Sequence, residues 1–108
     1  MTIYTCENTF EAMMTCIYDA WDSKKGHQNI RLKAEPVGDM ELFCEYRPIQ
    51  TDTAKAKKVI RSIQRKLSNT AYIMVYRCAM SEQPDKLDRI YRFLLLGFAY
   101  PDKITDML

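Results

Sequence analysis

The sequence has no pair of cysteines spaced as a metal-binding or redox motif, and it has only one histidine. The four cysteines are Cys6, Cys16, Cys44 and Cys78. Zinc sites need closely spaced Cys or His ligands, and His27 has no such neighbour. We therefore expect no metal site, and we interpret the cysteines as reduced thiols of a cytoplasmic protein.

Long hydrophobic runs are missing too. The apolar stretch Phe93–Leu96 is far too short to span a bilayer, and residues 1–10 lack the basic start and apolar run of a signal peptide. Glycine and proline are scarce, at three and four residues, while 47% of the 108 residues are hydrophobic. This composition is typical of a globular chain with one domain over residues 1–108, and it predicts no membrane partner.

Motifs of catalysis and nucleotide binding are also absent. There is no G-x-G-x-x-G and no Walker A motif. No pair of carboxylates has a spacing that indicates acid–base or metal chemistry. A Ser/His/Asp or Cys/His arrangement would have to be assembled from unrelated positions. The sequence thus predicts no catalytic residue and no cofactor, and it leaves open whether the protein is an enzyme.

Seven segments have the composition or periodicity of regular structure. Residues 2–6, 30–33 and 40–46 are strand-like, with Pro36 and Gly38 favouring a turn between the last two. Helices are predicted over 8–23, 53–67, 69–80 and between Pro84 and Pro101. We expect an α+β fold, in which a small antiparallel sheet of about three strands is followed by a helix-rich C-terminal part.

The predicted helices carry specific expectations about burial. Asn8 followed by Glu11 resembles a capping box, and Thr51 or Asp52 can cap the second helix. On the first helix a core stripe is expected, consisting of Phe10, Met13, Met14, Ile17, Ala20 and Trp21.

The helix 69–80 is apolar almost all round, so we expect it to be buried. Arg77 is its one charge, and we expect an internal carboxylate such as Asp88 as its partner rather than a ligand phosphate. The tyrosines and phenylalanines after residue 71 could stack on bases, but we expect them to pack in the core, with burial of the Tyr76 and Tyr91 rings beneath surface hydroxyls as the alternative. Residues 102–108 can form one more turn with an apolar ending.

Positive charge is concentrated in one region. The net charge is only +2, yet residues 53–81 hold seven of the sixteen basic residues and none of the fourteen acidic ones. With a step of about 100° per residue, Lys57, Lys58, Arg61 and Arg65 form one stripe of the helix 53–67, and Lys66 lies at its flank. The opposite stripe is apolar and consists of Ala56, Val59, Ile60, Ile63 and Leu67.

Like charges on neighbouring turns repel one another, and no Glu or Asp lies three or four residues away to relieve them. An anion that completes the stripe would explain the pattern, and nucleic acid is the favoured partner. We therefore predict a phosphate-binding surface at Lys57, Lys58, Arg61, Arg65 and Lys66. A solvated face without a ligand, RNA, an acidic protein or an anionic membrane surface would fit the same charges.

Three stretches carry a resemblance to a known family: "YTCENTFEAMMTCIYDAW" (4–21), "VIRSIQRKLSNTAYIMVYRCAMSEQPDKLDRIYRFLLLGF" (59–98) and "ITDML" (104–108). They resemble a bacterial family that is assigned to DNA metabolism or DNA repair and whose precise function is unknown. Its members are encoded beside a radical-SAM protein of DNA modification or repair, and a related domain is fused to a uracil-DNA glycosylase. The matching positions are Arg61, Ser62, Arg65, Lys66, Tyr76, Arg77, Asp88, Tyr91, Arg92, Phe93, Gly97 and Phe98.

The resemblance implies a DNA-binding accessory module of a bacterial DNA repair or modification system. Family members are about twice as long, so this chain looks like their N-terminal portion, and Pro101 stands where the family continues with Gly. The alternative is a non-catalytic adaptor that docks a radical-SAM partner. It would use the apolar ending 104–108 or a face made by Asp85, Arg89 and Arg92.

Overall fold

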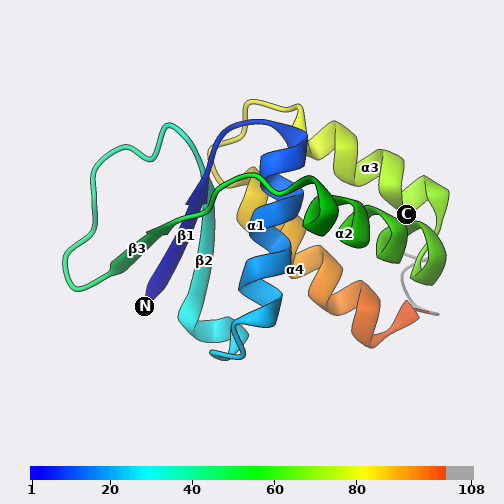
Figure 1. The fold of residues 1–108 in the computed structure, drawn as a ribbon, viewed down its shortest axis with the longest axis horizontal. Coiled ribbons are helices and arrows are strands. Elements are labelled where there is room, and N and C mark those ends of the chain that lie inside the picture. Colours follow the sequence, from blue (N-terminus) through cyan, green and yellow to red (C-terminus); the bar gives the residue numbers. More distant parts are fainter. Residues whose placement is uncertain (102–108) are drawn as a thin grey trace.

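The computed structural model describes residues 1–101, which form a three-stranded sheet and four α-helices (Figure 1). In chain order the elements are β1 (Thr2–Cys6), α1 (Phe10–Asp22), a short 3-10 helix η1 (His27–Asn29), β2 (Ile30–Ala34), β3 (Glu45–Pro48), α2 (Thr53–Lys66), α3 (Asn69–Ala79) and α4 (Lys86–Ala99). The predicted numbers of strands and helices are confirmed. None of these helices is long and apolar enough to cross a membrane. The turn predicted for 102–108 lies outside the described residues.

The sheet is parallel, with the strand order β2-β1-β3, so the predicted antiparallel sheet is wrong. Thr2 in the central strand pairs with Ile30 on one side and with Glu45 on the other. The reason lies in the two connections. α1 carries the chain back to the edge from which β1 started, as a parallel pair requires. Residues 35–44 then cross from one side of β1 to the other, so β3 also runs parallel.

Residues 35–44 form a loop over the sheet, and the third strand begins at Glu45 rather than at residue 40 as predicted. The backbone N–H of Glu41 donates to the Tyr46 hydroxyl (2.8 Å), and the Glu41 carboxylate lies 3.6 Å from the Arg31 guanidinium. Arg31 and Tyr46 are the register partners of Ile3 on either side. Glu41 therefore bridges the outer strands above Ile3, which is completely buried.

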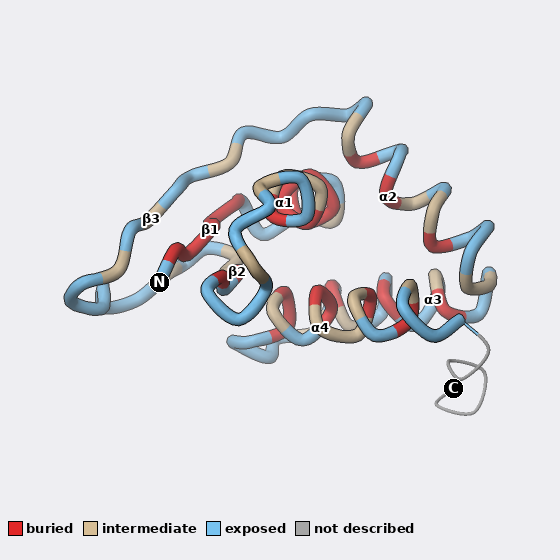
Figure 2. Tube along the Cα trace, turned by 90° about the horizontal axis from the view of Figure 1, so that it is seen from below, coloured by how far each residue is buried: buried red, intermediate tan, exposed pale blue. Residues whose placement is uncertain are grey.

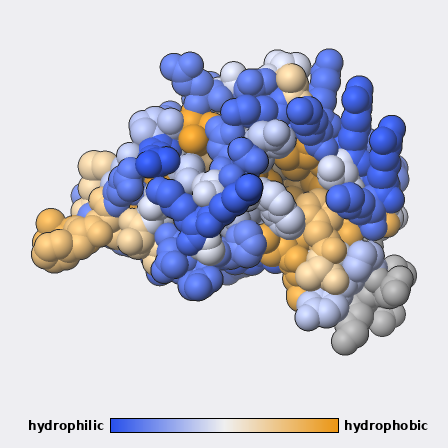
Figure 3. Space-filling view, turned by 60° about the horizontal axis from the view of Figure 1, so that its bottom comes forward, coloured by the Kyte–Doolittle hydropathy of each residue, from blue (hydrophilic) through white to orange (hydrophobic). Residues whose placement is uncertain are grey.

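The loop ends in an exposed apolar tip made by Met40, Leu42 and Phe43. Phe43 is 99% exposed, and its backbone has a φ of 63°. Bulky residues rarely adopt this left-handed conformation. Figure 3 shows the hydrophobic tip projecting from the rest of the molecule. Packing within residues 1–101 therefore does not explain why a phenylalanine occupies position 43.

α1 lies at the centre of the helical layer, between the sheet and α2, while α4 packs against β2 (Figures 1 and 2). The predicted core positions Met13, Met14, Ile17 and Ala20 are buried. Trp21 is 45% exposed, so its prediction as a core residue is wrong. It lies in the last turn of α1, where its ring contacts His27 and Phe98.

The start of α1 differs from the predicted capping box. Thr9 is the capping residue, and its hydroxyl accepts the backbone N–H of Ala12 (3.2 Å). The side-chain oxygen of Asn8 instead accepts a hydrogen bond from Lys86 Nζ (2.7 Å). A long-range contact has therefore taken the side chain that the local pattern assigned to the helix end.

α3 is buried on one side only, so the prediction of a fully buried helix is wrong. Ala71, Val75 and Ala79 face the core, because α3 packs against α2 and α4 at the edge of the helical layer. Its outer side is exposed and carries Ile73, Met74, Tyr76 and Arg77. Arg77 forms no ion pair within residues 1–101, and its predicted partner Asp88 pairs with Arg92 instead (3.4 Å).

Asp88 and Arg92 attach α4 to the sheet. Asp88 accepts the backbone N–H of Leu32 in β2 (3.2 Å). Arg92 donates to the backbone carbonyls of His27 (2.6 Å) and Ile30. These contacts replace sheet hydrogen bonds at the free edge of β2. α4 itself begins at Lys86, two residues later than the predicted start at Pro84.

Tyr91 is completely buried, and its hydroxyl lies 2.8 Å from Nδ1 of His27. The prediction of a surface hydroxyl for Tyr91 is therefore wrong. Burial raises the pKa of Tyr91 to about 12. Tyr76 is 44% exposed, so the prediction that its ring is buried is wrong.

Candidate nucleic-acid interface

α2 is an amphipathic helix with a sharply defined start. The Asp52 carboxylate accepts the backbone N–H of Lys55 (3.2 Å), which confirms one of the two predicted caps. Ala56, Val59 and Ile63 are buried against the core, and Ile60 and Leu67 are packed against it at the margins. The apolar stripe is thus fixed inward, and the opposite side of the helix has to face solvent.

The structure places all five predicted cations at the surface. This basic face consists of Lys57, Lys58, Arg61, Arg65 and Lys66, each of them exposed. None of the five forms an ion pair within residues 1–101, unlike Lys55 on the same helix, whose ammonium contacts Asp19 (2.8 Å). The hydrogen bond with Asp19 raises the pKa of Lys55. Figure 3 shows hydrophilic side chains projecting in a row beside hydrophobic surface.

The charges of the basic face are uncompensated over a long stretch of chain. Side chains on adjacent turns of a helix are about 5–6 Å apart, so four or five like charges repel one another. The chain supplies no acidic residue between residues 53 and 81. A bound polyanion would remove this repulsion, and solvent alone only screens it.

Aromatic rings lie directly beside the basic face. The ammonium of Lys58 lies 5.7 Å from the centre of the Tyr18 ring, and that of Lys66 lies 5.8 Å from the centre of the Phe98 ring. Phe98 contacts Trp21 edge-on, with their ring centres 5.5 Å apart. We call Tyr18, Trp21 and Phe98 the aromatic surface. Three helices contribute to this area, because the rings come from α1 and α4 and the cations from α2.

Sequence reasoning missed the place of Trp21 in this surface. The helical angle of Trp21 assigned it to the core, but helical angles do not reveal which side chains surround the last turn of α1, where Trp21 contacts His27 and Phe98. The sequence did contain a signal for a surface position, because Trp21, the one tryptophan, is directly followed by the polar segment 22–29. His27 was given no role, yet it contacts both Trp21 (5.7 Å between ring centres) and the Tyr91 hydroxyl.

Five of the positions that carry the family resemblance fall into two groups. Arg61, Arg65 and Lys66 belong to the basic face, whereas Asp88 and Arg92 fasten α4 to β2. The second group therefore has a structural explanation that needs no ligand. Phe98 joins the two groups, because it lies on α4 and contacts Lys66.

The described residues offer little for metal or thiol chemistry. Within residues 1–101 no group of three or more His, Cys, Asp or Glu side chains is arranged to hold a metal ion. Cys6 and Cys16 are buried free thiols. The hydrogen bond with Cys6 and burial raise the pKa of Cys16 far above its ordinary value. Cys16 therefore stays protonated and is a poor nucleophile.

Comparison of the chain with protein-family models, with curated proteins and with solved structures gives no match. The family resemblance in the sequence therefore stays a prediction. The function has to be inferred from the side chains and their surroundings.

Proposed function

We propose that this protein binds nucleic acid, with DNA favoured, through the basic face of α2 and the aromatic surface beside it. One observation carries the proposal: five exposed cations on one helix have no internal counter-ion within residues 1–101. The favoured role of DNA rests on the resemblance to DNA metabolism and repair proteins.

The chemistry of the basic face suits a phosphate backbone. Arg61 and Arg65 can each bind two phosphate oxygens, while Lys57 and Lys58 act as point charges. A row of cations about 5–6 Å apart can contact several phosphates of one strand. Contacts of this kind fix the position of the nucleic acid without reading its sequence. We therefore expect binding with little sequence preference.

The aromatic surface favours a single strand over a duplex. Unpaired bases can stack on exposed rings, at about 1–3 kcal/mol per base, whereas the bases of a duplex are already stacked on each other. Trp21 is the most exposed of the three rings, and Phe98 holds it edge-on. Lys58 and Lys66 lie over the neighbouring rings, so phosphates bound there would bring their bases to the aromatic surface.

The biological role that fits this binding is an accessory module of a bacterial DNA repair or modification system in the cytoplasm. A radical-SAM protein is the partner that the resemblance implies. In this role the protein would hold a strand while another protein or another part of a longer chain performs the chemistry.

The adaptor alternative depends on two other surfaces. The ending 104–108 lies outside the described residues. On α4, Arg89 pairs with Asp85 (2.8 Å), and Arg92 binds the carbonyls at the start of β2. Because these charges are already satisfied within the chain, this face has less to offer a charged partner than the basic face has.

A charge-reversal experiment tests the proposed function. The double variant Arg61→Glu with Arg65→Glu is compared with a control, Lys25→Glu with Arg77→Glu, which changes the net charge equally. Both control residues are exposed and lie outside the ion pairs of residues 1–101. Binding of fluorescein-labelled oligothymidylate is followed by anisotropy, with a duplex of equal length as competitor.

We expect the α2 variant to bind at least about 100-fold more weakly, because each reversed charge removes one phosphate contact and adds repulsion. The control should lose much less. Equal losses of affinity in the two variants would show that only the net charge of the protein matters, and this would contradict the proposal. Stronger competition by the duplex would refute the preference for a single strand.

A further inference from the structure

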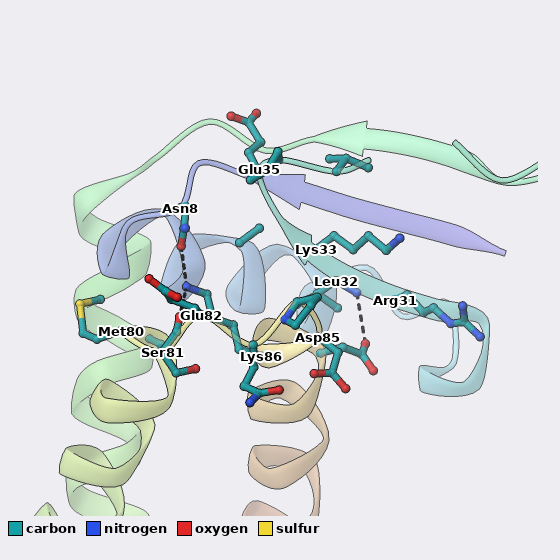
Figure 4. A pocket seen from close by; sticks show the side chains of 17 residues that line it. Asn8, Arg31, Leu32, Lys33, Glu35, Met80, Ser81, Glu82, Asp85 and Lys86 are labelled. Carbon is teal, nitrogen blue, oxygen red and sulfur yellow. Dashed lines mark hydrogen bonds between the residues drawn. The ribbon is translucent and has the colours of Figure 1, made fainter. Parts of the chain in front are cut away.

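A hollow of about 940 Å³ lies where the carboxyl ends of β1 and β2 meet the segment between α3 and α4 (Figure 4). In open parallel sheets, ligands bind outside the carboxyl ends of the strands, because these ends and the helix starts converge there. The volume is that of a small-molecule site. The cations of the basic face are not among the residues that line it.

Lys86 is the unusual residue of this hollow. Its side chain is buried, with only 6% exposed, and lysine is almost never buried this far without a carboxylate partner. The ammonium donates to the side-chain oxygen of Asn8 (2.7 Å) and to the backbone carbonyl of Ser81 (2.9 Å), as Figure 4 shows. Both acceptors are neutral. The third N–H has no acceptor within residues 1–101, and the charge has no counter-ion there.

Two further sets of donors accompany Lys86. Because the oxygen of Asn8 accepts from Lys86, its NH2 group remains to donate to a ligand. Asp85 occupies the capping position of α4 but makes no capping hydrogen bond, since its carboxylate pairs with Arg89 (2.8 Å). The backbone N–H of Lys86 donates to the Gln83 carbonyl (3.2 Å), while the next amides, those of Leu87 and Asp88, have no side-chain cap within residues 1–101 at the positive end of the helix dipole.

None of the acidic residues that line the hollow forms an ion pair with Lys86. Asp88 is occupied by Arg92 and by the backbone of β2, and Asp85 is occupied by Arg89. Glu35 and Glu82 are exposed and form no ion pair within residues 1–101. In Figure 4 the Glu35 side chain points away from Lys86, whereas Glu82 is drawn near Lys86 but forms no ion pair with it.

We propose that this hollow binds a phosphate monoester, with the Lys86 ammonium, the Asn8 amide and the backbone amides of Leu87 and Asp88 as its donors. A phosphate monoester has three terminal oxygens, so it can accept from all of these donors at once. Its charge would also balance the buried ammonium. The same group occurs on a free nucleotide and on the 5′ end of a DNA strand. The site is independent of the proposed function, because it uses none of the residues of the basic face.

The decisive variant is Asn8→Asp, which replaces the neutral acceptor of Lys86 by a carboxylate. If Lys86 is short of a counter-ion, the new ion pair should preserve or raise the thermal midpoint while it removes the charge that attracts the phosphate. Lys86→Met deletes the ammonium, and Lys25→Gln, outside the hollow, serves as the control for a lost lysine. Binding is followed by the amide NMR signals of Leu87 and Asp88, the first amides after Lys86.

The probes are adenosine 5′-monophosphate against adenosine, and oligothymidylate with a 5′-phosphate against the same strand with a 5′-hydroxyl. We expect only the phosphorylated member of each pair to shift the Leu87 and Asp88 signals. A response to the mononucleotide alone identifies a free nucleotide as the ligand, and a response to the strand alone identifies a strand end. Asn8→Asp should weaken binding by roughly 10-fold or more, and Lys25→Gln should not.

The proposal is overturned if adenosine shifts these signals as strongly as its phosphate does, or if neither phosphate moves them. It is also overturned if folded Asn8→Asp protein binds as tightly as the wild type. The comparison of 5′-phosphate with 5′-hydroxyl cancels any binding by the basic face. Failure here therefore leaves the proposed function untouched, and failure of the proposed function leaves this test valid.

Discussion

The ammonium group of Lys66 lies 5.8 Å from the centre of the Phe98 ring, where it links the end of α2 to the end of α4. Phe98 contacts Trp21, and Trp21 is 45% exposed. The surface therefore carries three groups in succession: the Lys66 ammonium, the Phe98 ring beneath it and the exposed indole of Trp21. Phosphate contacts and base stacking require this combination side by side.

The single tryptophan gives a direct optical test of the aromatic surface. We expect the fluorescence of Trp21 to be quenched when oligothymidylate binds, because a base stacks on the indole. Trp21→Ala should weaken binding of a single strand by about 1–3 kcal/mol, whereas Trp21→Phe retains a ring and should lose less. The affinities are measured by anisotropy of a labelled strand. An unchanged affinity in Trp21→Ala would remove the aromatic surface from the interface.

The buried hydroxyl of Tyr91 predicts a loss of stability at alkaline pH. The pKa of Tyr91 is about 12 in the folded protein, against 10 as the ordinary value, because burial disfavours the phenolate. Below pH 10 the residue is protonated in both states and the full stabilisation is present. Between about pH 10 and 12 the unfolded state loses its proton first, so the free energy of unfolding falls by about 2–3 kcal/mol.

Tyr91→Phe isolates this effect from the other tyrosines. At neutral pH the variant should be about 1 kcal/mol less stable than the wild type, because it loses the hydrogen bond to His27. As the pH rises above 10, this difference should shrink and then reverse. Urea unfolding at pH 7, 9 and 11 measures it. A constant difference over this range would show that Tyr91 titrates normally.

Phe43 offers a test of backbone strain without a change of packing. Its φ of 63° is unfavourable for a phenylalanine, and its ring is 99% exposed. Asparagine tolerates this conformation better, so Phe43→Asn should stabilise the protein by about 0.5–1 kcal/mol. Phe43→Ala removes the same ring but keeps an ordinary Cβ, and we expect little gain from it. Equal thermal midpoints for the two variants would contradict the strain.

The direction of the strands could not be predicted from their own residues. All five residues of β1 are buried, so the strand lacks the alternation that distinguishes one-sided sheets. Pro36 and Gly38 resembled the turn of a hairpin, but they belong to a loop that passes over the sheet to its other side. The helix between the first two strands was the better guide, because parallel strands need such a crossover.

Local periodicity predicted the basic face well and the hollow not at all. The two stripes of α2 follow from helical angles, so the positions of Arg61 and Val59 could be read from the sequence. Lys86 looks like one more surface lysine, because its partner Asn8 lies 78 residues away. Asn8 in turn looked like a helix cap. No local pattern reveals a contact between two such distant residues.

The salt dependence of binding tests the central claim most directly. If the basic face neutralises about five phosphates, the logarithm of the binding constant should fall with the logarithm of salt concentration with a slope of about −3.5 for a single strand, or about −4.5 for a duplex. For a single strand this corresponds to roughly 100-fold weaker binding at about 200 mM than at about 50 mM salt. In Arg61→Glu with Arg65→Glu the slope should flatten by about 1.4 for a single strand, or about 1.8 for a duplex. A flat response in the wild type, or the same slope in both proteins, would contradict the assignment of α2 as a phosphate-binding surface.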